Sequence, residues 1–353
     1  MEDNGVHKIL EEKDVEGILF LSPENIRYLT GFSGSEGYLI VKENANLLLV
    51  DSRYITQAHE ETQGCRIALL EQDIKGLREH IAPLIVKRLG FEAQSISVAL
   101  FEQLRKEMKG VRLIPVMEDL ERLRGLKTPE EIAAIKKAIT IAEGAWNKVM
   151  EMIGSKVRED EVALELEHSM RKAGSEGIAF DCIVASGPRS ALPHAQPTSR
   201  PFQEGDFILF DFGARYGGYC SDESCTVVLG QATEEQRRIY GIVKDAHDRA
   251  IERIKPGITL AEIDAAARDH ITKAGHGPHF GHSTGHGVGL AIHEWPRVGK
   301  NSQDVAEVGM IFTVEPGIYI PGLGGVRIED MVLVTADGCE VLTTISKDLL
   351  MVD

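Results

Sequence analysis

Cysteine is scarce in this sequence of 353 residues, and no two cysteines form a C-x-x-C pair. The five cysteines are odd in number and scattered along the chain: Cys65, Cys182, Cys220, Cys225 and Cys339. This pattern excludes a disulfide framework and a sulfur-rich zinc site, and it is typical of reduced thiols in the cytosol. We therefore expect a cytoplasmic protein.

Long apolar runs are also missing, because no stretch reaches the roughly 18 apolar residues that indicate a membrane-spanning helix. The first residues, "MEDNGVHKILEEKD", are acidic and lack the basic and then apolar layout of a signal peptide. We expect no membrane partner.

Basic residues are outnumbered, with 39 Lys and Arg against 55 Asp and Glu, which gives a net charge of -16. Phosphate contacts need clustered Lys and Arg, so the composition argues against a nucleic-acid partner. The acidity has an ordinary interpretation, which is a well-solvated surface. It also has a sharper one, which is that some of the carboxylates bind cations.

The first 120 or so residues alternate short apolar runs with amphipathic stretches. The expected strands are "GILFL", "GYLIV", "NLLLVD", "CRIALLE", "ISVAL" and "RLIPV", and the expected helices are residues 52–61, 74–89 and 101–108. Such alternation predicts an α/β domain. This region contains no phosphate loop and no group of candidate metal ligands, so it does not indicate a function.

A domain boundary is expected at "LRGLKTPEEI", which divides the chain into residues 1–124 and 125–353. Thr128, Pro129 and Glu131 there form a helix start, with a capping hydroxyl, a proline at the first helical position and a reciprocal acid. The same capping signature predicts two later helix starts, one at residues 233–236 and one at residues 259–262.

The second region contains an internal duplication. Residues 161–174 resemble residues 262–275, and "GDFILFDFG" sets Asp211 where "GMIFTVEPG" sets Glu315. Further along, "SDESCTVVL" sets Asp222 where "RIEDMVLV" sets Glu329. Each half therefore predicts a pair of helices followed by strands. Equivalent strands would meet near a pseudo-symmetry axis, where the four acids would converge.

Four converging carboxylates predict a metal site. Isolated carboxylates on buried strands cost several kcal/mol, and four together would repel each other, whereas two divalent ions about 3.5–4 Å apart would remove the repulsion. Oxygen ligands with one imidazole and no thiolate favour manganese, cobalt or iron(II), although zinc can enter. The sequence also has four closely spaced histidines, and their spacing alone leaves open which of them binds: His279, His282, His286 and His293.

For each acid taken singly, an ordinary structural role is the simpler interpretation. Asp211 would start a turn, Asp222 would cap an element, and Glu329 would pair with Arg327. The "DFG" triplet at Asp211 also suggests a kinase, but the sequence lacks the glycine-rich nucleotide loop and the H-R-D motif. The matched positions in a duplicated frame favour the metal site.

Several segments resemble the pita-bread metallopeptidases, the group of Xaa-Pro dipeptidases (prolidases) and Xaa-Pro aminopeptidases. They are "DFGARYGGYCSDESCT", "GHSTGHGVGLAIHE", "FTVEPGIYIPGLGGVRIED" and the linker "LRGLKTPEEI". The segments "NIRYLTGFSGSEGYLIV" and "DSRY" resemble the creatinase-type domain that precedes the catalytic domain in those enzymes. The resemblance implies a creatinase-like α/β domain over residues 1–124. It implies a pita-bread α+β catalytic domain, a duplicated helix pair plus sheet, over residues 125–353.

The resemblance also implies five metal ligands for two divalent ions. Asp222 and Glu329 would bridge the ions, Asp211 would bind one of them, and His286 with Glu315 would bind the other. Manganese is the expected metal, with cobalt, iron(II) and zinc as alternatives.

The implied reaction is hydrolysis of the peptide bond before proline in Xaa-Pro dipeptides, through a hydroxide that bridges the metal ions. Glu315 would carry the proton, and His293 would stabilise the tetrahedral oxyanion. His194 and His282 would orient the substrate, and one of them could protonate the leaving nitrogen. The family arginine matched by Arg327 belongs to the surroundings of the metal ligands and is also assigned to substrate binding.

Two positions require separate interpretation. Arg297 would bind the terminal carboxylate of a dipeptide, or else be a solvated arginine or pair with Glu294. His279 matches no family position and is expected to be structural.

One motif departs from the family pattern. The family reads S-D-x-T-R-T where this chain has "SDESCT". Ser224 keeps a hydroxyl near the metal, but Cys225 loses a guanidinium whose role must be filled by another group. This departure affects the expected stability or metal preference.

The nearest alternative function is an Xaa-Pro aminopeptidase that acts on longer peptides. A methionine aminopeptidase would lack the first domain. A non-catalytic pita-bread binding protein or a metal-free creatinase-like enzyme would have lost metal ligands, and none of the five is lost here. The resemblance further implies a homodimer.

Overall fold

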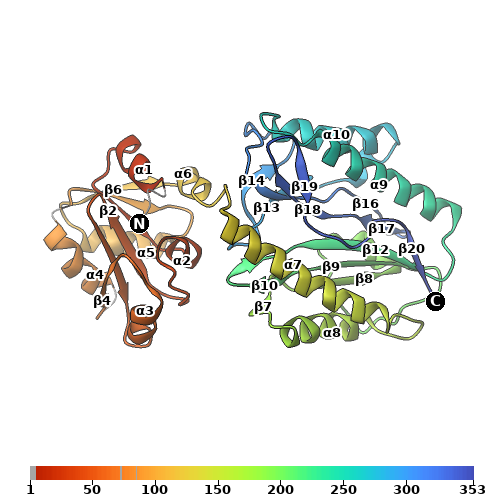
Figure 1. Cartoon of the computed structure of the whole chain (residues 1–353), viewed down its shortest axis with the longest axis horizontal. Helices are drawn as coiled ribbons and strands as arrows, with labels where there is room; N and C mark the ends of the chain where they lie inside the picture. Colours follow the sequence, from red (N-terminus) through yellow and green to blue (C-terminus); the bar gives the residue numbers. More distant parts are fainter. Residues whose placement is uncertain (1–4, 72–73, 85) are drawn as a thin grey trace. The chain divides into compact units, whose positions relative to one another are not determined.

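The chain divides into two compact units, Met1–Arg124 and Gly125–Asp353. The computed structural model describes residues 5–71, 74–84 and 86–353 of the chain. Figure 1 colours the elements by their order in the sequence.

The first unit is a six-stranded mixed sheet with helices on both faces, an α/β domain as predicted from the sequence. The strand order is β4-β3-β2-β1-β5-β6, with β2 antiparallel to both β1 and β3 and the other pairs parallel. The strands are β1 (Gly17–Phe20), β2 (Tyr38–Lys42), β3 (Ala45–Val50), β4 (Arg66–Leu69), β5 (Arg88–Glu92) and β6 (Arg112–Val116). The helices are α1 (Val6–Glu12), α2 (Pro23–Thr30), α3 (Ile55–Glu61), α4 (Ile74–Ile81), η1 (Ala82–Leu84), α5 (Val98–Glu107) and α6 (Glu118–Arg122).

Strand β1 explains why the sheet is covered on both sides. All four of its residues are buried, and alternate side chains enter two different cores. Ile18 and Phe20 pack into one core with α1 and α2, whereas Leu19 packs into the other with α4 and α5. A strand buried on both faces has a continuous apolar run, as "GILF" does.

Two sequence predictions in this unit are wrong. The predicted helix over 74–89 ends at Ile81 and gives way to η1 and β5, because Pro83 cannot continue an α-helix and disfavours helical backbone before it. Ile85 lies outside the described residues. The predicted strand "ISVAL" instead leads into α5, since the Ser97 side chain accepts a hydrogen bond from Leu100 N and caps that helix.

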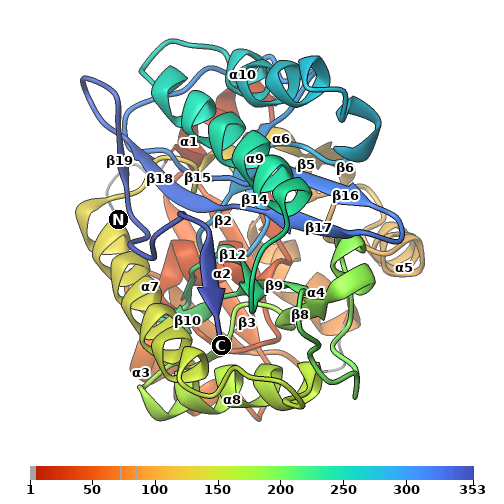
Figure 2. The ribbon, with the colours of Figure 1, turned by 90° about the vertical axis from the view of Figure 1, so that its right-hand side faces the viewer.

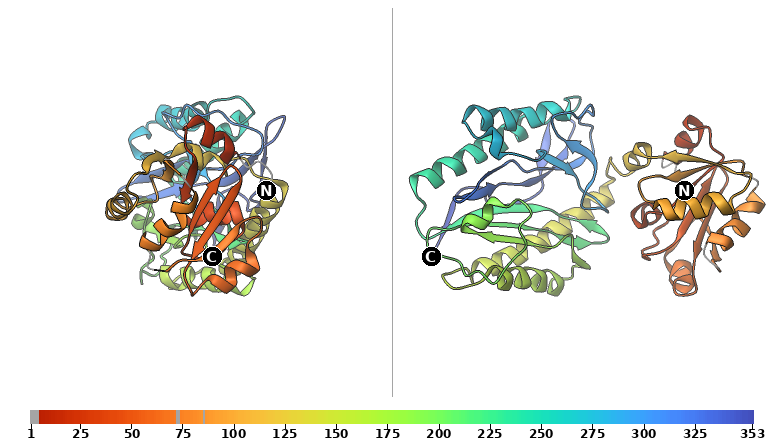
Figure 3. Two further views of the ribbon diagram at one scale, coloured as in Figure 1. Left: turned by 90° about the vertical axis from the view of Figure 1, so that its left-hand side faces the viewer. Right: turned by 180° about the vertical axis from the view of Figure 1, so that it is seen from behind.

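The second unit has two helix pairs with strands between them (Figures 1 and 2). The helices are α7 (Pro129–Met150), α8 (Glu159–Lys172), α9 (Glu234–Arg253), α10 (Leu260–Lys273), η2 (Gly187–Ala191) and η3 (Gly277–His279). Capping boxes begin α7, α9 and α10, which confirms the three predicted helix starts. The view from behind shows the same two pairs on opposite sides of the strands (Figure 3).

The strands of the second unit fall into four sheets. Their orders are β11-β10-β7, β20-β12-β9-β8, β14-β13-β15-β18-β19 and β16-β17. The strands of the first half are β7 (Gly177–Ile178), β8 (Ile183–Ser186), β9 (Phe207–Phe212), β10 (Ala214–Tyr216), β11 (Tyr219–Cys220) and β12 (Glu223–Leu229). The later strands are β13 (Gly285–Gly287), β14 (Glu294–Val298), β15 (Ile311–Val314), β16 (Gly317–Ile320), β17 (Gly324–Arg327), β18 (Asp330–Val334), β19 (Cys339–Val341) and β20 (Leu350–Val352).

Each helix pair covers the strands of its own half. Helices α7 and α8 share an apolar core with β8, β9 and β12. Helices α9 and α10 share another with β15, β17 and β18. The fold is therefore the duplicated helix pair plus sheet that the sequence predicts.

Candidate metal centre

The five predicted metal ligands lie on or beside short strands of the second unit. Asp211 is on β9, and Asp222 directly precedes β12, the antiparallel partner of β9. His286 is the middle residue of β13. Glu315 directly follows β15, and Glu329 directly precedes β18, which is antiparallel to β15. In the first half, the pairing of β9 with β12 puts Asp211 and Asp222 at the same end of the two strands. In the second half, the pairing of β15 with β18 does the same for Glu315 and Glu329.

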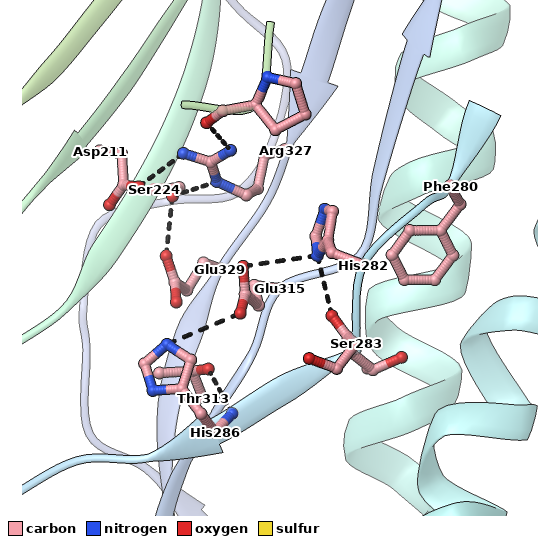
Figure 4. A network of polar contacts seen from close by, with 12 residues as sticks. Asp211, Ser224, Phe280, His282, Ser283, His286, Thr313, Glu315, Arg327 and Glu329 are labelled. Atoms are coloured by element: carbon pink, nitrogen blue, oxygen red, sulfur yellow. Dashed lines mark hydrogen bonds and ion pairs between the residues drawn. The ribbon is translucent and has the colours of Figure 1, made fainter. Parts of the chain in front are cut away.

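Figure 4 shows four of these side chains, Asp211, His286, Glu315 and Glu329, in one network of polar contacts. One ligand atom from each of Asp222, His286 and Glu329 lies within 4.8 Å of the others. His286 Nε2 lies 3.5 Å from Asp222 Oδ2 and 3.7 Å from Glu315 Oε1. The charge of Asp211 acts on Asp222, Glu315 and Glu329, so the fifth residue faces the same centre.

Asp222 and Glu329 are buried, Asp211 and Glu315 are partly buried, and the four carboxylates repel one another. Burial, and then the charge of Glu329, raises the pKa of Asp222 and that of Glu315 well above their ordinary values. Burial, and then the charge of Asp211, raises the pKa of Glu329 to about 7. A bound cation would offset both the burial and the mutual repulsion, because its positive charge stabilises the ionised carboxylates.

The histidines beside these acids are held neutral. Burial, and then the neighbouring His293, lowers the pKa of His286 to about 4. A neutral imidazole offers a lone pair, which a metal ligand requires. His286 therefore meets the chemical condition for a ligand at neutral pH.

A divalent cation fits the groups that are present. Asp211 Oδ1 is buried and has no hydrogen-bond partner, although its other oxygen, Oδ2, lies 2.5 Å from Arg327 Nη2. A buried, unpaired carboxylate oxygen is costly unless something binds it. Oxygen donors with one imidazole and no thiolate are the donor set of a hard or borderline divalent ion.

Arg327 connects the centre to its surroundings. The side chain is buried, and its guanidinium donates to Ser224 Oγ at 2.8 Å, to Asp211 Oδ2 and to the carbonyl oxygen of Pro193 at 3.1 Å. A further hydrogen bond from Nη1 goes to the Tyr319 hydroxyl at 3.0 Å, so four of the five guanidinium N–H donors are already used within the protein. The geometry therefore favours an indirect role for Arg327, through the groups that it orients.

Tyr319 belongs to the same network, and the sequence did not single it out. Its hydroxyl lies 2.9 Å from His282 Nε2 and accepts a hydrogen bond from Arg327 Nη1 at 3.0 Å. Tyr319 is on β16, directly opposite Gly325 on β17. In the sequence, the one feature that could have indicated this role is the glycine opposite the tyrosine in the hairpin, because it leaves space for the tyrosine ring to pack across the two strands.

His282 has both ring nitrogens engaged. Nδ1 lies 2.8 Å from the carbonyl oxygen of Ser283 and 3.8 Å from Glu315 Oε2, while Nε2 faces Tyr319. The carbonyl requires the proton on Nδ1, so Nε2 accepts from the tyrosine hydroxyl. Burial, and then Arg327, lowers the pKa of His282 to about 4, which keeps it neutral.

His293 and His194 are exposed at the edge of the centre. The ring of His293 lies 4.3 Å from that of His286, centroid to centroid, and burial lowers the pKa of His293. His194 is close enough for its charge to lower the pKa of both His282 and His293. Both side chains are open to a substrate.

The two remaining candidates lie on different elements. Arg297 is exposed on β14, where it pairs with His286 on β13. Residues that pair across two strands project from the same face of the sheet, so Arg297 shares the face of His286. His279 lies on η3, with its ring 5.7 Å from that of His276, and does not join the ligand group.

The unusual "SDESCT" segment keeps its polar contacts. Ser224 Oγ donates to Glu329 Oε2 at 2.7 Å and accepts from Arg327, so the serine hydroxyl orients a predicted bridging ligand. The buried Cys225 Sγ lies 3.7 Å from Lys347 Nζ. A buried cation is thus present beside the cysteine.

Comparison with known proteins identifies the family. Residues 133–336 match the model of metallopeptidase family M24, and residues 4–126 match the creatinase/prolidase N-terminal domain. The chain belongs to metallopeptidase family M24. This membership confirms the predicted resemblance and the predicted order of a creatinase-type domain before a pita-bread domain. It also implies that the protein binds divalent metal ions.

Relatives match the M24 chain over nearly its whole length. It is 40% identical over 347 residues to a Xaa-Pro dipeptidase of Pyrococcus furiosus, covering 97% of each chain. The structure of a Xaa-Pro dipeptidase from Bacillus anthracis is 40% identical, with a TM-score of 0.95 and 98% of each chain covered. An X-Pro aminopeptidase from Thermotoga maritima is 36% identical, with a TM-score of 0.89, covering 98% of this chain and 100% of the other.

None of the helices in the described part of the M24 chain has the length and apolar character needed to span a membrane.

Proposed function

We propose that this protein is a proline-specific metallopeptidase that hydrolyses the Xaa–Pro bond of dipeptides. The observation that carries the proposal is the convergence of buried carboxylates on a neutral histidine, with one buried Asp211 oxygen left without a partner. The Xaa-Pro dipeptidases among its relatives support the substrate class.

The proposed metal ligands are Asp211, Asp222, His286, Glu315 and Glu329. They would hold two divalent ions, with manganese preferred over cobalt, iron(II) and zinc because the donors are mostly oxygen. When bound, the ions polarise the scissile carbonyl and lower the pKa of water toward about 7.

The side chains around the ions are proposed to transfer the proton, stabilise the oxyanion and orient the substrate. The Glu315 carboxylate takes the proton of the attacking water and returns it to the departing amine. His293, exposed beside His286, donates a hydrogen bond to the oxygen that becomes negative in the transition state. His194, also exposed, orients the substrate and can supply a proton to the proline nitrogen.

The His282 side chain is held in one orientation and contributes to the surface that orients the substrate. Its two nitrogens are held by Ser283 and Tyr319, and its ring also packs edge-on against Phe280 at a centroid distance of 5.1 Å. A side chain fixed in this way orients a substrate with little loss of entropy on binding.

Arg297 is proposed to bind the terminal carboxylate of the dipeptide. It is exposed and pairs with His286 across β13 and β14, so its guanidinium can reach the substrate from the face that carries the metal ligand. Selection of the free carboxylate would make the enzyme a dipeptidase.

Hydrolysis assays with Ala-Pro, Met-Pro and a Xaa-Pro-Xaa tripeptide, each with added Mn²⁺ or Co²⁺, test the proposal. Cleavage of the dipeptides alone is the expected result. Preference for the tripeptide would instead establish the aminopeptidase, a candidate that the Thermotoga maritima relative favours.

Elemental analysis of the purified protein tests the rival class. We expect about two transition-metal ions per chain. A chain that binds none after anaerobic reconstitution would be a non-catalytic binding protein or a metal-independent enzyme.

We further propose a cytoplasmic homodimer. The reduced-thiol pattern of the five cysteines supports the location, and the family resemblance supports the dimer. Sedimentation velocity of the full chain would give twice the mass of 38.8 kDa if the dimer forms.

A further inference from the structure

Lys347 is a buried cation on the far side of the strands that carry two of the proposed ligands. It lies between β19 and β20, and its side chain is 6% exposed. Its Nζ contacts Glu223 Oε1 and lies 3.3 Å from Asp330 Oδ1. Both acids are themselves buried. The mechanism proposed above uses none of these three residues.

The two acids have particular positions in the sequence. Glu223 directly follows Asp222 at the start of β12, and Asp330 directly follows Glu329 at the start of β18. Successive residues of a strand project to opposite faces of a sheet. The ligands therefore face the metal centre while Glu223 and Asp330 face Lys347.

Lys347 thus joins the two halves of the duplicated fold. Strand β12 belongs to the four-stranded sheet of the first half, and β18 belongs to the five-stranded sheet of the second (Figure 1). On the face of these strands opposite to Lys347, the two halves are also joined, because Ser224 Oγ of β12 donates to the Glu329 carboxylate. The spacing of Asp222 and Glu329 is consequently set from both faces.

Further contacts hold Asp330 in place. Thr343 Oγ1 donates to Asp330 Oδ1 at 2.6 Å, and His247 Nε2 from α9 lies 3.0 Å from Asp330 Oδ2. Glu223 has no comparable support, because its second oxygen, Oε2, is buried without a hydrogen-bond partner. The pairing of β12 with β9 holds the Glu223 backbone, and Lys347 Nζ is the polar partner that holds its carboxylate.

We propose that Lys347 is a positioning residue for the metal centre. By binding the acids that follow Asp222 and Glu329, it fixes the separation of the two carboxylates that would bridge the ions. The inference rests on the proposed metal site and extends it to a group that touches neither metal nor substrate. Residues that orient metal ligands from outside contribute about 10–100-fold to metal affinity.

The test compares Lys347→Met with Lys347→Arg in the full chain. Methionine keeps the apolar length and removes the charge, whereas arginine keeps the charge. Lys347 lines a cavity of about 440 Å³ together with Trp146 of α7, Tyr240 of α9 and Cys225, whose Sγ lies 3.7 Å from Nζ, so space for the larger head group is available. Lys136→Met is the matched control, because Lys136 makes an exposed ion pair with Glu340 at 2.7 Å.

The main readout is the dissociation constant for Mn²⁺, from calorimetric titration of metal-free protein. We expect Lys347→Met to weaken binding by about tenfold. Lys347→Arg should stay within about threefold of wild type because it keeps the charge, and Lys136→Met should match wild type. The second readout is kcat for Met-Pro at saturating Mn²⁺, which should fall in Lys347→Met while KM changes little.

Loss of the lysine leaves buried acids without a cation, so Lys347→Met could fail to fold. The double variant Lys347→Met/Glu223→Gln avoids this because it also removes one of the acids. We expect it to fold, as judged by circular dichroism, and still to bind Mn²⁺ weakly. A wild-type affinity in either folded variant, or an equal loss in Lys136→Met, would overturn the positioning role alone. Wild-type protein that binds no Mn²⁺ would overturn this inference together with the proposed function.

Discussion

The hydroxyl of Tyr319 lies 2.9 Å from His282 Nε2 and accepts a hydrogen bond from Arg327. Through this one oxygen, the arginine that holds Asp211 also holds a histidine at the edge of the proposed active site. A proposed ligand and a residue proposed to orient the substrate are therefore held by the same buried guanidinium.

Tyr319→Phe should separate these two functions. The change removes only the hydroxyl and leaves a buried nitrogen and a guanidinium N–H without that partner, which costs about 1–3 kcal/mol. We expect kcat for Met-Pro to fall about tenfold, with unchanged metal content, because Arg327 keeps its contacts to Asp211 and Ser224. Loss of metal in this variant would show that Tyr319 supports the ligands instead.

The proposed bridging ligands give a second prediction. Asp222→Asn and Glu329→Gln each remove a charge that both ions would share, so kcat should fall by at least about 100-fold even at saturating Mn²⁺. Asp160→Asn is a control in the same unit, because Asp160 makes an exposed ion pair with Arg158. Full activity of either ligand variant would contradict the dinuclear assignment.

The raised pKa of Glu329 predicts how the stability of metal-free protein depends on pH. Its folded value of about 7 lies above the ordinary glutamate value of 4.5, so the folded state holds the proton more tightly than the unfolded state. Below about pH 4 the carboxyl is protonated in both states and does not change the free energy of unfolding. Between about pH 4 and pH 7 it lowers the free energy of unfolding by an increasing amount, and above about pH 7 the loss is constant.

Glu329→Gln removes this cost. In urea unfolding without metal, we expect the variant to gain stability relative to wild type as the pH rises from 4 to 8, with most of the change below pH 7. Because both proteins contain the same histidines, their contribution cancels in the difference. A difference that is independent of pH would contradict the assignment of the raised pKa to Glu329.

His293→Ala tests the proposed oxyanion contact. If His293 donates to the developing negative charge, kcat should fall by about 10²–10³ while KM and metal content change little. Metal content is measured on the same preparations by elemental analysis. A variant that instead loses an ion and regains normal turnover on reconstitution would make His293 a ligand.

Local sequence patterns were sufficient where the structure depends on neighbours along the chain. The capping boxes begin their helices as predicted, and the apolar run "GILF" corresponds to a strand covered on both faces. The predicted helix over 74–89 is wrong because Pro83 ends the α-helix inside the amphipathic stretch.

The candidate site was predictable in part because the fold is duplicated. Matched positions led to Asp222 and Glu329, whose oxygens lie beside the His286 ring in the structure. Tyr319 and Lys347 were not predicted, because each contributes through contacts with segments distant in the sequence. Periodicity and spacing carry no information about which remote strand or loop such a side chain meets.

Arg297 is the residue proposed to distinguish the two peptidase activities. A dipeptidase must recognise the free carboxylate of the terminal proline, and an arginine can bind it with two hydrogen bonds. The side chain is exposed and shares a sheet face with His286, its partner across β13 and β14. The suggested pairing with Glu294 has a strong competitor, since Glu294 Oε1 lies 2.8 Å from Lys127 Nζ with both side chains 1% exposed.

Arg297→Ala should therefore raise KM for Met-Pro by at least about tenfold, the effect of losing a charge-assisted hydrogen bond of about 1.5–3 kcal/mol. Cleavage of a tripeptide with proline second should change little, because its carboxylate lies one residue further away. Lys300→Ala removes a nearby exposed charge and should leave both substrates unaffected. Equal losses on both substrates, or no loss on either, would exclude Arg297 from carboxylate recognition and leave peptide length as the only basis for distinguishing the activities.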